Sequence, residues 1–171
     1  MVGNAEALPI TPRSVDIVTA AGSLNYADLS LFFPEAVRVL TPDGMLVVYD
    51  FSQGRSFRGS PSLDTWFSEF LCRYPMPLDS GHEVSPESLG SCDSGFLLSG
   101  HEHFEVGLKL NPDFYLDYVM TETNVSHAVQ NGISEQQIRA WCADTLAPVF
   151  QGSPHEVLFR GYVAVMVNQT L

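Results

Sequence analysis

A tight turn between an amphipathic helix and an apolar strand constrains this chain most. Residues 38–44 read Arg-Val-Leu-Thr-Pro-Asp-Gly, and the apolar run 45–49 follows at once. Upstream, residues 15–21 form a short apolar segment that predicts a strand. Strand, helix, turn and strand over residues 15–50 have the spacing of a right-handed crossover in a parallel sheet. The sequence therefore predicts an α/β fold.

The helix before this turn has one apolar stripe, which suits a helix that packs on a sheet. Its members are Leu29, Phe32, Phe33, Ala36, Val37 and Leu40. Pro34 lies inside the pattern, and because proline removes a backbone bond and clashes with the preceding turn, we expect a late helix start or a kink at residues 31–33. Glu35 and Arg38 lie on the opposite side, which predicts a solvated face.

Two stretches rich in Gly, Ser and Pro, residues 52–62 and 75–100, predict loops. Between them, residues 63–74 carry apolar and aromatic side chains at helical spacing. These side chains either pack in the core or cover an acceptor pocket, since ligands bind beyond the carboxyl ends of strands in open α/β sheets. We interpret residues 52–100 as a lid-like insertion within a single domain, residues 1–171.

The rest of the chain predicts further helices and strands. The expected elements are a strand over 101–110, a helix from 112 to 119, a capped helix over 133–150 and a terminal strand over 156–167. Ser134 and Gln137 have the spacing of a capping box at the start of the long helix. Gly161 predicts a bulge in the terminal strand.

Three alternate residues, His101, His103 and Glu105, would lie on one face of a strand. Two histidines and a carboxylate in this pattern can ligate a metal, but exposed histidines on a strand are also ordinary. No second cluster supplies a further ligand with clear spacing. We therefore assign no metal site from the sequence.

Composition and charge exclude several classes of partner. With 171 residues, of which 45% are hydrophobic, the chain is long enough for a compact core. A net charge of −12 with only eight Lys and Arg residues disfavours nucleic acids and anionic membrane surfaces. No apolar run is long enough to cross a bilayer, and no signal segment is found. Three widely spaced cysteines indicate neither a disulfide framework nor a Cys-x-x-Cys metal site, so we expect a cytoplasmic protein.

Three segments in the right order, residues 3–9, 14–20 and 35–44, together resemble the class I S-adenosylmethionine-dependent methyltransferases that act mostly on small molecules. In that family the first segment reads Gly-Asp-Ala-Glu-x-Leu-Pro, and the third ends in Arg-Val-Leu-Lys-Pro-Gly-Gly. This chain departs from the pattern at Asn4, Thr41 and Asp43, which are mild changes.

The glycine-rich loop that holds the methionine end of the cofactor in this family has no counterpart in the sequence. The resemblance therefore implies a partial Rossmann-like methyltransferase sheet with flanking helices, without the N-terminal cofactor-binding half. S-adenosylmethionine is the implied cofactor, and we expect this chain alone to bind it weakly or not at all.

The resemblance also implies site residues, although it assigns none as catalytic. Those implied to contact the cofactor are Asn4, Ala5, Glu6, Ala20, Ala21 and Gly22, and those implied to face the acceptor are Asn25, Tyr26 and Asp50. Asn4 would accept a hydrogen bond from the adenine amine, and the Ala5 N–H would donate to a ring nitrogen. Alternatively, Asn25 and Tyr26 form only a loop-to-helix transition, and Asp50 either acts as a base or caps the following loop.

The implied function is methyl transfer from S-adenosylmethionine to a small-molecule acceptor. The alternative is a non-catalytic binding or assembly module built on a truncated methyltransferase fold. The strand over residues 15–20 would have a neighbour on each side in the complete fold, and one of them is the family's first strand. Its free edge predicts pairing with a second copy or with a partner chain.

Overall fold

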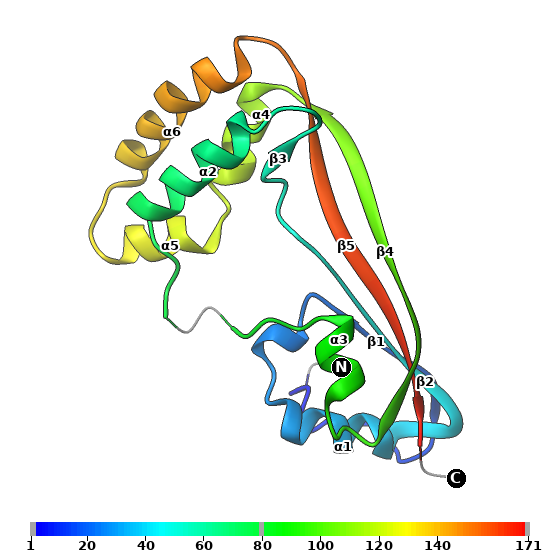
Figure 1. Cartoon of the computed structure of the whole chain (residues 1–171). Coiled ribbons are helices and arrows are strands. Elements are labelled where there is room, and N and C mark those ends of the chain that lie inside the picture. The colour runs from blue at the N-terminus through cyan, green and yellow to red at the C-terminus, as the bar shows by residue number, and fades with distance from the viewer. Residues whose placement is uncertain (1–2, 79–80, 170–171) are drawn as a thin grey trace. The chain divides into compact units, whose positions relative to one another are not determined.

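The computed structural model describes residues 3–78 and 81–169 (Figure 1). It divides into two compact units, each assembled from segments that are distant in the sequence. Unit 1 comprises Met1–Phe51, Gly81–Phe104 and Gly161–Leu171, and unit 2 comprises Ser52–Ser80 and Glu105–Arg160. Strands β4 (Phe96–Leu110) and β5 (His155–Asn168) contribute residues to both units.

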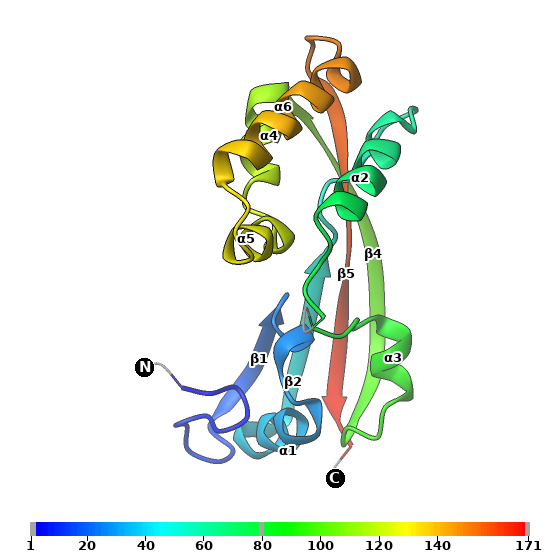
Figure 2. The same ribbon diagram turned by 90° about the vertical axis from the view of Figure 1, so that its left-hand side faces the viewer.

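Unit 1 contains the predicted crossover. Its elements are β1 (Val15–Ala21), a short 3₁₀ helix (Leu24–Tyr26), α1 (Leu29–Val39), β2 (Leu40–Phe51) and α3 (Pro86–Ser91). β1 and β2 are parallel, and Figure 2 shows α1 alongside them. Phe32, Phe33 and Ala36 of α1 are buried with Leu46 of β2, as the apolar stripe predicts.

Helix α1 does not start late. Asp28 caps it through a side-chain bond from the Ser30 N–H, at 3.0 Å, and the helix then runs from Leu29 to Val39 with Pro34 inside it. Pro34 is exposed, so its ring lies on the solvent side of the helix. The capping side chain outweighs the proline in setting where the helix begins.

The predicted turn at residues 41–44 is instead an irregular part of β2. Val15 pairs with Leu40, whereas Ile17 pairs with Met45. Between these two pairs β1 advances by two residues and β2 by five. Gly44 lies in this irregular part, where a Cβ would lie 2.9 Å from the Leu40 side chain and 3.1 Å from the Asp16 carbonyl oxygen of β1. A glycine at this position therefore lets the two backbones approach while β2 returns to register.

Strand β5 runs antiparallel to β2 in an unbroken register from Phe51–Gly161 to Met45–Val167. The bulge predicted at Gly161 is therefore wrong. A Cβ at this position would lie 2.4 Å from the Asp50 carbonyl oxygen and 2.5 Å from the Phe104 ring. The glycine allows close packing within a regular strand.

Unit 2 is a helical unit around an aromatic core. Its helices are α2 (Ser62–Arg73), α4 (Pro112–Val119), α5 (Thr123–Gln130) and α6 (Glu135–Phe150), and its short strand β3 (Ser56–Phe57) pairs with β5. Trp66, Phe67 and Phe70 of α2 are all buried against Ile138, Cys142 and other residues of α6, α4 and α5. The core interpretation of this aromatic helix is therefore correct. The capping box of Ser134 and Gln137 is also confirmed.

The complete sheet is mixed, with the order β1-β2-β5-β3 and with β4 also paired to β5. In this order β1 is an end strand that pairs, among the described residues, only with β2. Its Ile17 side chain is 55% exposed. The helices of the described ranges are too short or too polar to cross a membrane.

Candidate functional site

The carboxyl ends of β1 and β2 meet in unit 1 because the two strands are parallel. Gly22 follows β1 directly with a positive φ of 55°, and its N–H donates to the Tyr49 carbonyl oxygen at 2.9 Å. A Cβ on Gly22 would lie 3.2 Å from Oδ1 of Asp50. A side chain at position 22 would therefore be strained and would crowd the Asp50 carboxylate.

Asp50 binds two groups at this edge. Its Oδ2 accepts a bond from Nδ2 of Asn25 at 3.2 Å, and its Oδ1 accepts one from the Phe51 N–H at 2.8 Å. The second bond comes from the next residue of β2, and the first fixes the amide of Asn25. The nearby Tyr162 hydroxyl has a pKa raised to about 12, by burial first and then by the charge of Asp50.

Asn25 is also held through its backbone. Its carbonyl oxygen accepts a bond from the His82 N–H at 3.0 Å. Gly81 has a φ of 93°, and a Cβ there would lie 2.6 Å from the same oxygen. Tyr26, the next residue, is 69% exposed. The structure thus orients Asn25 from two sides and leaves the Tyr26 ring open to solvent.

The N-terminal segment forms a tight turn in which the Ala7 N–H donates to the Asn4 carbonyl oxygen at 3.1 Å. Asn4 is exposed, while Ala5 packs against the core of unit 1. Glu6 accepts a bond from the Asp28 N–H at 3.0 Å, at the start of α1. Glu6 therefore ties this turn to the segment that follows Asn25.

Glu35 and Arg38 do not form a merely solvated face, so that prediction is wrong. Glu35 accepts bonds from the Leu8 N–H at 2.6 Å and from Nε of Arg38 at 2.7 Å. Arg38 donates to the carbonyl oxygens of Leu8 and Ile10, at 3.0 and 2.8 Å. The pair thus fastens the N-terminal segment to α1, although its i, i+3 spacing is equally typical of a surface ion pair.

Replacing Arg38 by alanine should loosen this segment without unfolding unit 1. We expect faster amide exchange at residues 4–10, measured by hydrogen–deuterium exchange, and little change in β2. The control is Arg139→Ala, which removes an exposed pair with Asp117 in unit 2. Unchanged exchange at residues 4–10 would contradict the fastening role.

The same loosening should follow acidification. The pKa of Glu35 is lowered, chiefly by its hydrogen bond to Arg38. A lowered pKa in the folded state means that the interaction is fully present above the ordinary carboxyl pKa and is lost as the pH falls through the lowered value. The protection of residues 4–10, that is, their exchange relative to the intrinsic rate at each pH, should therefore fall in the acidic range, and Glu35→Gln should remove that dependence.

The predicted residues form two groups. Gly22, Asn25 and Asp50 lie together at the ends of β1 and β2, with Ala20 buried and Ala21 exposed beside them. Asn4, Ala5 and Glu6 are linked to this place through the Glu6–Asp28 bond. Gly81 and His82 were missed because a glycine and a histidine in a loop carry no distinguishing pattern.

Glu105 does not join His101 and His103, contrary to the strand-face pattern. Its two oxygens bind Arg58 and Arg160, at 3.0 and 2.9 Å. Both oxygens of the Glu105 carboxylate are thus paired with guanidinium groups, which form strong charge-assisted hydrogen bonds with carboxylates.

Comparisons with known proteins bear on the fold of the chain. A sequence profile described as "Methyltransferase domain" matches residues 1–48, which include the N-terminal turn, β1, α1 and most of β2. A search of curated proteins finds no match.

Among solved structures, the chain is similar to a candidate type II methyltransferase from Anaeromyxobacter dehalogenans. The identity is 20%, the match covers 98% of this chain and 70% of that one, and the TM-score is 0.68. A candidate methyltransferase from Bacillus halodurans C-125 is 17% identical, with 96% and 68% of the chains covered and a TM-score of 0.51.

A geranyl diphosphate C-methyltransferase from Streptomyces coelicolor A3(2), solved with S-adenosyl-L-homocysteine, matches more weakly. It is 18% identical, with 98% of this chain and 52% of that one covered and a TM-score of 0.43. The sheet order, the profile match and the first structural match lead to one conclusion. The chain has the fold of the class I S-adenosylmethionine-dependent methyltransferases.

Proposed function

We propose that this chain takes part in methyl transfer from S-adenosylmethionine to a small-molecule acceptor. The observation that carries the proposal is the grouping of Gly22, Asn25 and Asp50 beyond the carboxyl ends of β1 and β2. Ligands of open α/β sheets bind in this position. The net charge of −12 favours an acceptor that is not a nucleic acid.

The residues present fit the adenosine side of this cofactor. Asn4 is exposed, so its side-chain oxygen is available to accept a bond from the adenine amine. Gly22 leaves room where a Cβ would approach Asp50, so the backbone there can lie close to the cofactor. The sequence contains no counterpart of the glycine-rich loop that holds the methionine end in the family, so the proposal concerns the adenosine side alone.

On the acceptor side, Asn25, Tyr26 and Asp50 would orient the nucleophile. The cofactor, when bound, supplies an electrophilic methyl group. The acceptor would receive this methyl group, and S-adenosylhomocysteine would be the second product. Positioning is the main requirement of this step. Asp50, already bonded to Asn25 and Phe51, fits a positioning role and can also accept a proton from the acceptor.

A titration with S-adenosylhomocysteine, followed by amide NMR, tests this proposal. We expect the shifts to change mainly at residues 4–6 and 20–22, and an acceptor analogue to perturb residues 25, 26 and 50. Changes confined to unit 2 would contradict the proposal, and no change at millimolar ligand would favour the second candidate function below.

The edge of β1 that faces away from β2, which has no strand partner among residues 3–78 and 81–169, supports a second candidate function, a non-catalytic assembly module. An apolar strand with one unpaired edge exposes N–H and C=O groups to which another strand can add. Repulsion from the net charge of −12 would oppose such pairing, so added salt should promote it.

Sedimentation at low and high salt measures this association. We expect salt-promoted dimers of the native chain and monomers of Ile17→Lys, because a lysine on an edge strand disfavours strand addition. Leu31→Lys is the matched control, since Leu31 is 56% exposed on α1 and Ile17 is 55% exposed on β1. A salt-independent monomer at high protein concentration would rule out this edge as an interface.

A further inference from the structure

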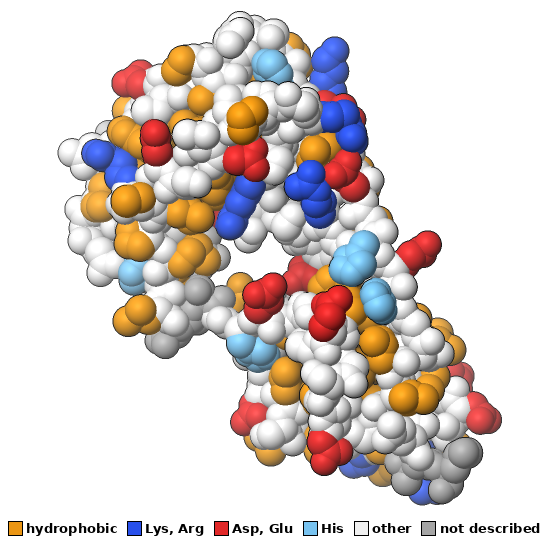
Figure 3. Space-filling view, viewed as in Figure 1, with side chains coloured by type: hydrophobic (Ala, Val, Ile, Leu, Met, Phe, Trp, Pro, Cys, Tyr) orange, Lys and Arg blue, Asp and Glu red, His pale blue; other side chains and the backbone are white. Residues whose placement is uncertain are grey.

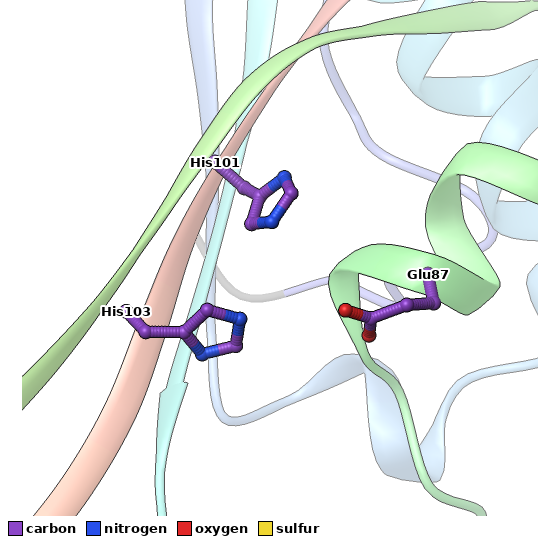
Figure 4. Close-up of side chains that lie close together, drawn as sticks. All are labelled: Glu87, His101 and His103. Atoms are coloured by element: carbon purple, nitrogen blue, oxygen red, sulfur yellow. The ribbon is translucent and has the colours of Figure 1, made fainter.

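Two histidines of β4 and a glutamate of α3 converge in unit 1 (Figure 4). His101, His103 and Glu87 are all exposed, and each offers a ligand atom within 4.8 Å of those of the other two. The two imidazole rings lie at an interplanar angle of 86° with centroids 5.5 Å apart. Figure 4 shows the glutamate carboxylate extending toward the two rings from the helix. None of these residues belongs to the predicted cofactor or acceptor set.

The backbone holds the two elements in fixed positions. His101 and His103 alternate along one strand, so their side chains emerge on the same face. Glu87 lies in the first turn of α3, which is set by a capping box between Ser85 and Ser88. Leu89 of α3 is buried, at 2% exposure, which anchors the helix in the core of unit 1.

Packing also joins α3 to the strands beside it. The Leu98 side chain of β4 packs closely against Gly90 of α3, since a Cβ at position 90 would lie only 3.2 Å from it. The Tyr162 hydroxyl donates to the Val84 carbonyl oxygen at 2.9 Å, just before the helix. The backbone of α3 is therefore held beside β4, and Figure 4 shows the Glu87 side chain on the side of α3 that faces the histidine pair.

The ligand chemistry is that of a late first-row metal. Two neutral imidazoles and one carboxylate form a common set for Zn²⁺ with an open fourth position, whereas Mg²⁺ and Ca²⁺ prefer oxygen ligands alone. Zn–ligand distances of about 2.0–2.2 Å place ligand atoms roughly 3.3 Å apart in a tetrahedral site. The exposed side chains must therefore turn toward one another by a small amount when the ion binds.

Histidine side chains also lie next to each other on the face shown in Figure 3.

We propose that Glu87, His101 and His103 form a binding site for a zinc-like divalent cation, which links α3 to β4. Zn²⁺ itself is the probe, titrated by calorimetry into the tag-free chain, with Mg²⁺ as the contrasting ion. We expect one Zn²⁺ per chain, a higher melting temperature with Zn²⁺, and no heat with Mg²⁺.

Substitutions test whether Zn²⁺ binds at these three side chains or at other histidine and cysteine side chains of the protein. His101→Ala and His103→Ala should each weaken Zn²⁺ binding by about tenfold or more, and Glu87→Gln should weaken it by a smaller factor. His82→Ala and Cys72→Ser, at exposed positions outside the cluster, should leave it unchanged. Circular dichroism checks that each variant is folded. No Zn²⁺ binding, or binding that survives loss of both His101 and His103, would overturn the proposal.

Discussion

Phe70→Ala is expected to lower the free energy of unfolding of unit 2 by about 3–5 kcal/mol. The Phe70 side chain is fully buried in α2, at 0% exposure. Its ring centroid lies 5.1 Å from that of Trp66, 5.7 Å from Tyr74 and 6.4 Å from Trp141. Truncation therefore leaves a cavity and also removes several ring contacts. Both tryptophans of the chain are in unit 2, so their fluorescence during urea unfolding reports on this unit.

Phe114→Ala is the control, because Phe114 is 57% exposed on α4 and should change stability by only about 0.5 kcal/mol or less. A loss below about 1 kcal/mol for Phe70→Ala would contradict the packing described here. Quenching of tryptophan fluorescence by small apolar ligands, abolished in Phe70→Ala, would instead support the pocket interpretation of α2.

Arg55→Ala should also destabilise unit 2, because it leaves the carboxylate of Glu122 buried without its partner. The Glu122 side chain is 5% exposed, and Nη2 of Arg55 lies 3.9 Å from Oε2. The guanidinium also lies over the Phe67 ring, 4.6 Å from its centroid. Breaking a buried pair typically costs about 3–5 kcal/mol, and we expect roughly 2–3 here, since the Arg55 side chain is 34% exposed.

Lowering the pH should reduce this loss. Burial raises the pKa of Glu122 above its ordinary value. Above the raised pKa the carboxylate is charged in both folded and unfolded states, and the full burial penalty applies. As the pH falls through that value the folded state takes up the proton first, so stability rises. Glu122→Gln in the Arg55→Ala background should restore stability at neutral pH, and equal losses at pH 5 and pH 7 would contradict this account.

The sequence predicted well those parts of the fold that follow from local patterns. Apolar periodicity located α1, α2 and β1, and the Ser134–Gln137 capping box marked the start of α6. Helices α3 and α5 were missed, because α3 is short and lies in a stretch rich in Ser and Gly. Tertiary packing fixes such short helices, and periodicity needs a longer segment.

The candidate site was predictable only in part for the same reason. Residues close together in the sequence, such as Gly22 and Asn25, were implied by the resemblance to the methyltransferases and not by a local pattern. Glu87 and His101 come from different elements, and only the fold brings them together. A pattern within one strand instead selected Glu105, which binds arginines of unit 2.

Saturation-transfer NMR with S-adenosylhomocysteine tests most directly the claim that this chain provides the adenosine and acceptor sides of a methyltransferase site. We predict strong transfer to the adenine protons, little to the methionine chain, and weak overall affinity. Asn4→Ala should weaken binding by about 1–3 kcal/mol, or roughly five- to 150-fold, and thus abolish the adenine signal. Asn131→Ala, at an exposed position in unit 2, should leave both the binding and the adenine signal unchanged. Equal saturation along the whole ligand, or adenine transfer that persists in Asn4→Ala, would contradict the claim.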